Sequence, residues 1–131
     1  AERPRFPARY EDAEQAAQAF VNAMQEGNLN QLFNVLAADV VLRGDGGGKI
    51  NARREPLYGV DDVVRFLKRV QRRESDTRIL KLMNLNGTPA MVEYRDGEIT
   101  SVTTFDFLDG KICAVYSLLN PDKLKGLAEQ L

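Results

Sequence analysis

Apolar residues near the start of the chain recur at helical spacing. After Asp12 they stand three or four positions apart, at Ala13, Ala16, Ala17, Phe20, Ala23 and Met24. One face of an α-helix repeats at this interval, and Gly27 supplies a stop signal. A second, shorter helix is expected to start from a capping box of Asn28 and Gln31. Its apolar face consists of Leu29, Leu32, Phe33 and Leu36.

The spacing of valines and leucines predicts a third helix over residues 61–73. Its inward positions are Val63, Val64, Leu67 and Val70. Its last turns carry Lys68, Arg69, Arg72 and Arg73, which complement the negative end of the helix dipole. The same cations offer a basic docking face as an alternative, although a net charge of −1 gives no wider basic footprint.

The second half of the chain alternates β-prone runs with three tight turns. Asn86-Gly87, Asp96-Gly97 and Asp109-Gly110 are dipeptides that favour positive φ at both central positions of a hairpin. They separate four runs that we expect to be strands, over residues 77–85, 88–94, 98–108 and 111–119. Consecutive strands joined in this way form an antiparallel meander. A further short strand is expected over residues 40–43, ahead of the third helix.

This order of elements predicts an α+β fold. Helices that precede a sheet pack on one of its faces, and the two long final strands indicate that the sheet bends around them into a cone. A short amphipathic helix is expected to end the chain after Asn120 and Pro121. Its apolar stripe consists of Leu124, Leu127, Ala128 and Leu131. This helix either covers the sheet or docks onto a partner.

The composition excludes several kinds of site. The chain has 131 residues, no histidine and one cysteine, so Ser-His-Asp triads, Cys-His nucleophiles and zinc sites are excluded. No metal or cofactor is expected. The net charge of −1 gives no general reason to bind DNA or an anionic membrane. We see no signal peptide or long apolar segment, so we expect a cytoplasmic protein in which Cys113 packs as a small hydrophobic residue.

Three consecutive glycines stand directly after the short strand, in the run Asp45, Gly46, Gly47, Gly48 and Lys49. Ordering three glycines costs more backbone entropy than ordering other residues. The run therefore indicates either a mobile loop or a close approach of the backbone to a partner. It does not match a phosphate-binding loop, because Ile50 follows Lys49 where Ser or Thr is needed and no helix begins there.

The interior of the expected cone has two interpretations. A pocket enzyme would need a desolvated acid beside a Tyr or Asp donor, for which the candidates are Asp45, Glu93, Tyr94, Asp106 and Tyr116. Strand alternation puts Asp106 on the face opposite to its two phenylalanine neighbours. The side chains assigned to line a pocket are Phe20, Met24, Phe33, Phe66, Phe105 and Tyr116. The aromatic ones among them equally make up a filled core, which we favour, and we assign no catalytic residue.

Two motifs together carry a family resemblance. The glycine run follows the first strand, and Asn120, Pro121, Asp122, Lys123 and Leu124 form a second motif near the end. With the entry segment Arg3-Pro4-Arg5-Phe6, they resemble the C-terminal SnoaL-like extension of a group of extracytoplasmic-function sigma factors. The segments Pro56–Gly59 and Asn86–Ala90 are also similar to that family. The resemblance covers essentially the whole chain.

The resemblance implies a cone of the nuclear-transport-factor type (NTF2-like, also called cystatin-type), fused behind the promoter-recognising domains of a sigma factor. Residues 1–9 are then the linker from those domains, and residues 10–131 the SnoaL-like domain. It implies a regulatory domain without enzymatic activity that contacts the sigma domains and acts indirectly on RNA polymerase. The contact residues carried over are Asp45 to Lys49 and Asn120 to Leu124. A small ligand in the cone, cyclase or isomerase chemistry, and homodimerisation of the isolated domain remain alternatives.

Overall fold

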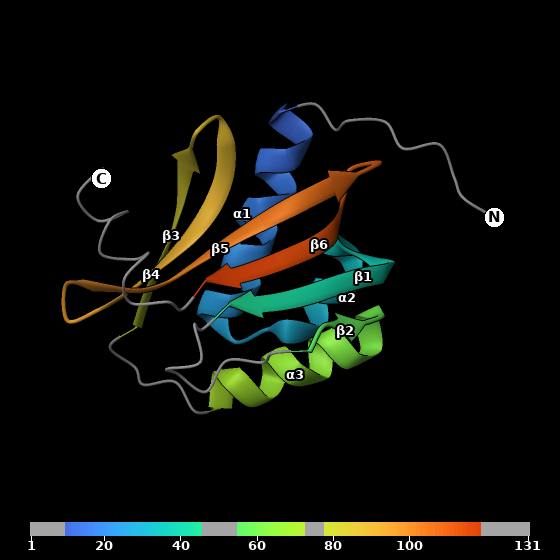
Figure 1. Cartoon of the computed structure of the whole chain (residues 1–131), viewed down its shortest axis with the longest axis horizontal. Helices are drawn as coiled ribbons and strands as arrows, with labels where there is room; N and C mark the ends of the chain where they lie inside the picture. Colours follow the sequence, from blue (N-terminus) through green and yellow to red (C-terminus); the bar gives the residue numbers. More distant parts are fainter. Residues whose placement is uncertain (1–9, 46–54, 73–77, 119–131) are drawn as a thin grey trace.

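The protein forms a single curved sheet with helices on one of its faces (Figure 1). The structure, a computed structural model, describes residues 10–45, 55–72 and 78–118. The helices are α1 (Tyr10–Glu26), α2 (Leu32–Val35) and α3 (Val60–Arg72). The strands are β1 (Leu36–Asp45), β2 (Leu57–Tyr58), β3 (Arg78–Leu85), β4 (Thr88–Arg95), β5 (Glu98–Leu108) and β6 (Lys111–Leu118). They pair in the order β2-β1-β6-β5-β4-β3. The α+β fold class is confirmed.

The three predicted hairpin turns are present in the structure. Asn86, Asp96 and Asp109 have φ angles of 53°, 52° and 53°, and the glycine that follows each of them is also at positive φ. Two consecutive residues at positive φ make the type I′ turn, whose twist matches that of the strands it joins. The turns connect β3 to β6 as a continuous antiparallel meander. Local turn chemistry therefore determines this half of the sheet.

One pair of strands is parallel, a feature that the sequence pattern did not reveal. β1 lies beside β6, with Val41 opposite Ala114 and Asp45 opposite Leu118. β1 is also longer than the predicted strand over residues 40–43, because it begins at Leu36. On its other side it pairs with the short β2. The sheet therefore joins the N-terminal elements to the meander through backbone hydrogen bonds.

The predicted second helix differs most from the expectation. The Asn28 side chain makes no capping hydrogen bond, so the capping box is wrong, and the first turn is a 3₁₀ helix over Leu29–Gln31. Leu36 is buried as predicted but is the first residue of β1, with φ −88° and ψ 140°. Phe33 is 42% exposed, so its assignment to the interior is also wrong. Four residues of α-helix are too few to form a full apolar face.

Irregular strand pairing gives the sheet its curvature. The register shifts between Glu93 and Tyr94, between Asp106 and Phe107, and along β1 between Leu36 and Val41. An extra residue on one strand bends the sheet and increases its twist. In β6 the shift lets Ile112 and Val115 both enter the core although they are three residues apart. The bends wrap the sheet around α1, as the sequence analysis expected.

The main core lies between the helices and the concave face of the sheet. α1 packs against β3, β4 and β6, while α3 packs against β1 and β2 (Figure 1). Phe20 of α1 is 1% exposed and meets Phe105 of β5 edge to face, with ring centroids 5.1 Å apart. Such aromatic pairs add to the stabilisation from apolar burial. The aromatic core predicted from the sequence is therefore present, with Phe20 and Phe105 at its centre.

The C-terminal end of α1 is fixed to the edge strand β3 by side-chain hydrogen bonds. Arg78 Nη2 donates to the carbonyl oxygen of Met24 at 2.8 Å. Gln25 Oε1 accepts a hydrogen bond from the Leu80 N–H at 2.8 Å. These contacts satisfy helix-end and strand-edge groups that have no partner within their own elements. Burial lowers the pKa of Arg78, and Glu93 partly opposes this effect.

The contrast between two phenylalanines can be tested directly. Phe20→Ala should lower the free energy of unfolding by about 3–5 kcal/mol, because it leaves a cavity in the core. Phe33→Ala should cost about 1 kcal/mol or less, because that side chain is largely solvated. Urea denaturation of both variants checks the difference. Equal losses from the two substitutions would contradict the assignment of Phe33 to the surface.

Candidate functional site

The two sequence motifs leave the sheet from neighbouring strands at one edge. β1 ends at Asp45, the first residue of the glycine motif, and β6 ends at Leu118, two residues before Asn120. Because the strands are parallel, they run to the same end of the sheet, and their arrowheads lie side by side in Figure 1. Asp45 and Leu118 are register partners. Adjacent strands are about 4.8 Å apart, so the two strands that lead into the motifs end at neighbouring points.

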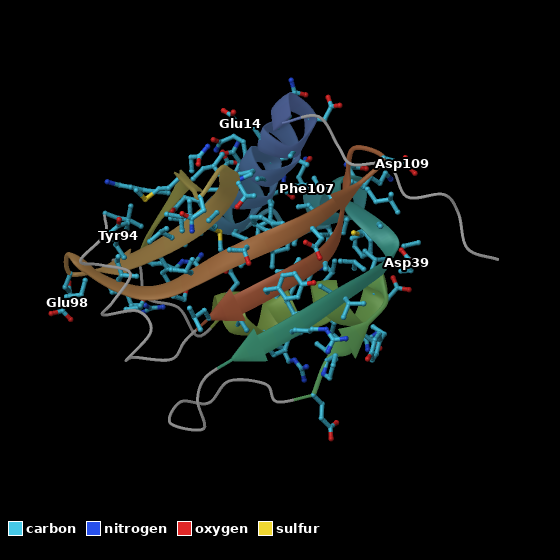
Figure 2. The ribbon with its side chains drawn as sticks, turned by 45° about the horizontal axis from the view of Figure 1, so that its top comes forward. Glu14, Asp39, Tyr94, Glu98, Phe107 and Asp109 are labelled. Atoms are coloured by element: carbon cyan, nitrogen blue, oxygen red, sulfur yellow. The ribbon has the colours of Figure 1, made fainter. Side chains whose placement is uncertain are left out.

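This end of the sheet is also where the β4–β5 hairpin lies. In Figure 2, Glu98 marks that hairpin, whereas Asp39 of β1 and Asp109 of the β5–β6 turn lie at the opposite end. Gly46, Gly47, Gly48 and Lys49 lie outside the described residues, as do Asn120, Pro121, Asp122, Lys123 and Leu124. For Asp45, the structure describes only the backbone. The position of the candidate site therefore rests on the two strands that lead into it.

A polar patch on the face of the sheet away from the helices extends from near this end of β1 and β6 back toward the β5–β6 turn. Tyr116 of β6 donates a hydrogen bond from its hydroxyl to Asp106 Oδ2 at 2.7 Å. Arg43 of β1 is the register partner of Tyr116. The hydrogen bond to Asp106 raises the pKa of Tyr116, with smaller contributions from burial and from the Asp106 charge. All three side chains are exposed, which suits them to contact a polar partner.

The predicted pocket residues do not form one group. Phe20, Met24 and Phe105 are buried in the main core, and Phe66 is partly buried against it. Phe33 and Tyr116 are 42% and 37% exposed, so the prediction that they line the interior is wrong. Tyr116 and its register partner Thr104 lie on the same face of the sheet. Phe105, the next residue after Thr104, is buried on the opposite face, so Tyr116 points away from the core.

The candidate acid–base residues are also separated by the sheet. Asp106 and Tyr116 are hydrogen-bonded on the outer face, and Asp106 lies on the face opposite the buried Phe105, as strand alternation predicted. Tyr94 packs in an apolar cluster of strand residues, and its hydroxyl lies 3.7 Å from Met83 Sδ. Glu93, opposite Leu80, contacts Arg95 Nε at 2.9 Å and Thr100 Oγ1 at 2.8 Å. Three of the five candidates therefore face away from the helix-lined concavity.

Among the described residues, no group of three or more acidic or cysteine side chains is arranged to hold a metal ion. Within the same part of the chain, no helix has the length and hydropathy required to cross a bilayer.

A second apolar cluster, which was not predicted from the sequence, has Ala90, Val92 and Val102 as its buried members. A usable signal was present, because the consecutive residues Ala90, Met91 and Val92 are all apolar. An uninterrupted apolar run predicts a strand that is buried on both faces, rather than on one.

The hydrogen bond between Tyr116 and Asp106 leads to a measurable titration. Asp106→Asn should lower the pKa of Tyr116 toward its ordinary value, because it removes the charged acceptor that stabilises the protonated phenol. Ultraviolet absorption between pH 8 and roughly pH 12 follows this ionisation, with Tyr116→Phe identifying its contribution. Asp109→Asn, at the opposite end of the sheet, serves as the control. An unchanged titration in Asp106→Asn would contradict the hydrogen bond.

Comparisons with known proteins identify relatives of the chain and of its fold. No protein-family model matches the chain. It is 32% identical over 114 residues to the ECF RNA polymerase sigma factor SigJ of Mycobacterium tuberculosis, covering 79% of this chain and 36% of SigJ. The chain therefore spans about a third of that relative. The crystal structure of SigJ matches with a TM-score of 0.72 and 27% identity, over 88% of this chain and 44% of that chain.

Smaller proteins share the fold at lower identity. A SnoaL-like protein of unknown function from Burkholderia thailandensis matches with a TM-score of 0.65 and 16% identity, over 85% of this chain and 97% of that one. A putative ketosteroid isomerase from Kribbella flavida matches with a TM-score of 0.62 and 17% identity, over 83% of this chain and 78% of that one. At these identities the likeness concerns the fold alone. The chain therefore has the SnoaL-like fold and is homologous to a segment of the extracytoplasmic-function RNA polymerase sigma factor SigJ.

Proposed function

We propose that this domain regulates transcription initiation by an alternative sigma factor. Its contact surface is the sheet edge where β1 and β6 end, together with the two motifs that follow them. The observation that supports the proposal is the parallel pairing of Asp45 with Leu118, which sets side by side the two strand ends that lead into motifs far apart in the sequence. Homology to SigJ supports sigma domains as the partner. In this proposal residues 1–9 connect the domain to sigma domains of the same polypeptide.

The chemistry of the two motifs fits recognition of a protein. Three glycines permit a close backbone approach, and Asp45 and Lys49 offer charge-assisted hydrogen bonds on either side of them. The second motif adds Asp122 and Lys123. Charge-assisted hydrogen bonds contribute specificity as well as binding energy to an interface. This suits a contact that forms and dissociates repeatedly. A net charge of −1 supports contact with sigma domains rather than with promoter DNA.

We infer that the domain acts without catalysis, in the cytoplasm where transcription occurs. An isomerase-like pocket would use an Asp and a Tyr. Here Asp106 and Tyr116 are hydrogen-bonded to each other on the outer face of the sheet. Phe20, Leu32, Leu36 and Ile112, each at most 2% exposed, fill the space between helices and sheet. A desolvated general base has no counterpart among the buried residues that the structure describes, whose polar members are Arg78, Ser101 and Thr103.

The partner in this proposal can be sought in the gene itself. The coding sequence immediately upstream of Ala1 should encode promoter-recognising sigma domains that end near Arg3. An open reading frame that starts at Ala1 would remove the intramolecular partner and overturn this form of the proposal.

Replacing Gly46, Gly47 and Gly48 together by alanine should change sigma-dependent transcription several-fold. Alanine side chains block a close backbone approach, while a surface segment that leaves a strand end contributes little to folding. In-vitro transcription with the sigma-domain-containing protein measures the effect, and thermal unfolding checks the fold. A matched control replaces three exposed residues of α1, Asp12, Glu14 and Gln15, by alanine. Normal transcription by a stably folded triple-glycine variant would contradict the proposal.

A charge reversal tests the second motif. Lys123→Glu should weaken binding to separately prepared sigma domains about tenfold, the effect of losing a contact of about 1.4 kcal/mol. Lys111→Glu makes the same charge change at the start of β6, at the other end of the sheet, and should leave binding unchanged. Titration calorimetry at physiological salt gives both affinities. Equal weakening by the two variants would indicate general electrostatic attraction instead of a defined contact edge.

A further inference from the structure

A second apolar cluster lies on the face of the sheet opposite to the helices. Its buried members Ala90, Val92 and Val102 have exposed fractions of 0%, 0% and 3%. Packed around them are Met83, Leu85, Tyr94, Ile99 and Leu118. All of these residues belong to β3, β4, β5 and β6, whereas the main core contains residues of the helices as well. Among the described elements, no helix contributes to this cluster.

The cluster is continuous with the point where the chain leaves the sheet. Leu118 of β6 is paired with Val102 of β5, and Val102 is paired in turn with Val92 of β4. Val92 is paired with Lys81 of β3. These residues form one row across the sheet from β6 to β3. Leu118 is also the last residue of β6. The segment 119–131 therefore starts at one end of an apolar row.

We propose that residues 119–131 dock their apolar stripe onto this cluster and lie across the strands from β6 toward β3. Leu124, Leu127, Ala128 and Leu131 recur at helical spacing, which gives one apolar face. A helix over residues 121–131 is roughly 16 Å long at about 1.5 Å per residue. The row from β6 to β3 spans three strand spacings, roughly 14 Å. The helix and the row therefore match in length, and the stripe matches the apolar members of the row in polarity.

The positive charge of Lys81, at the β3 end of the row, also favours a helix that runs from β6 to β3. Lys81 of β3 is exposed, and its Nζ lies 5.4 Å from the centroid of the Tyr94 ring. A helix that runs from β6 to β3 brings its C-terminal end, which carries the negative end of the helix dipole, toward this ammonium group. A second copy of the chain is the competing occupant. The tail is favoured because it is tethered to Leu118, within the cluster, at a high effective concentration.

This docking also bears on the candidate contact edge. The segment starts with Asn120 to Leu124, so a tail held on the cluster keeps that motif next to the end of β1. The tail's apolar stripe then serves as an internal anchor, while Lys123 and Lys125 lie outside the stripe.

Thiol labelling tests the proposal in the full chain. A single reactive cysteine is placed at Met83→Cys in a Cys113→Ser background, and its rate of reaction with a thiol reagent is measured. Adding Leu127→Asp, which puts a charge into the stripe, should raise the rate several-fold. Gln130→Asp adds the same charge away from the stripe and should not. Equal rates in all three proteins would overturn the proposal, as would protection that disappears on dilution together with a dimeric mass in light scattering.

Disulfide trapping provides a second measurement that leaves the cluster's central residues intact. The pair Met83→Cys with Leu131→Cys should form an intramolecular disulfide under mild oxidation in the Cys113→Ser background. The control pair, Phe33→Cys with Leu131→Cys, joins the tail to an exposed position on α2 and should remain reduced. Equal trapping of both pairs, or trapping of the control alone, would overturn the proposal. Far-ultraviolet circular dichroism confirms that each variant is folded.

Discussion

The parallel pairing of β1 with β6 is the interaction on which the rest of the molecule depends. β3 to β6 are joined by tight turns and form a unit that local contacts can build. β1 is remote from β6 in the sequence, so its pairing must overcome the entropy of closing a long loop. It does so with backbone hydrogen bonds and with apolar side chains such as Val40 and Leu42, which enter the core. β2 and α3 pack on β1 and join the fold through it.

The same pairing turns two short sequences into one candidate surface. Parallel neighbours have their C-terminal ends at the same end of the sheet, whereas antiparallel pairing would have separated the ends of β1 and β6 by the length of a strand. Arg43 and Tyr116 stand two residues before the ends of β1 and β6, and Tyr116 donates a hydrogen bond to Asp106 on the outer face. Homology to a sigma factor concerns most of the chain, and the register of β1 with β6 concerns only the strand ends that lead into the two motifs. The likeness to isomerases reflects the curved sheet, which serves many functions.

Apolar residues lie on both faces of the sheet. Apolar or aromatic character alone therefore does not tell which face a side chain occupies. The helices cover the concave face, where Phe20 and Phe105 meet as the sequence indicated. Tyr116 was assigned to the interior on its aromatic character alone, yet strand alternation puts it on the opposite face from its buried neighbour Val115. Phe33 follows a 3₁₀ turn rather than a regular helix start, so helical periodicity did not apply to it. Register shifts in β6 likewise cannot be read from a period of two.

The sequence by itself determined the elements whose cause is local. α1 and α3 follow from apolar spacing, and the hairpins follow from Asn-Gly and Asp-Gly pairs that accept positive φ at low cost. It also identified the two motifs and their family resemblance, but not the pairing of the strands that lead into them. Only the tertiary structure decided that β1 lies parallel to β6, that Asp45 is opposite Leu118, and that a second cluster occupies the outer face. Those features depend on which distant strands pair and in which direction. Pairing of this kind is settled by the packing of the whole core rather than by any residue's own preference.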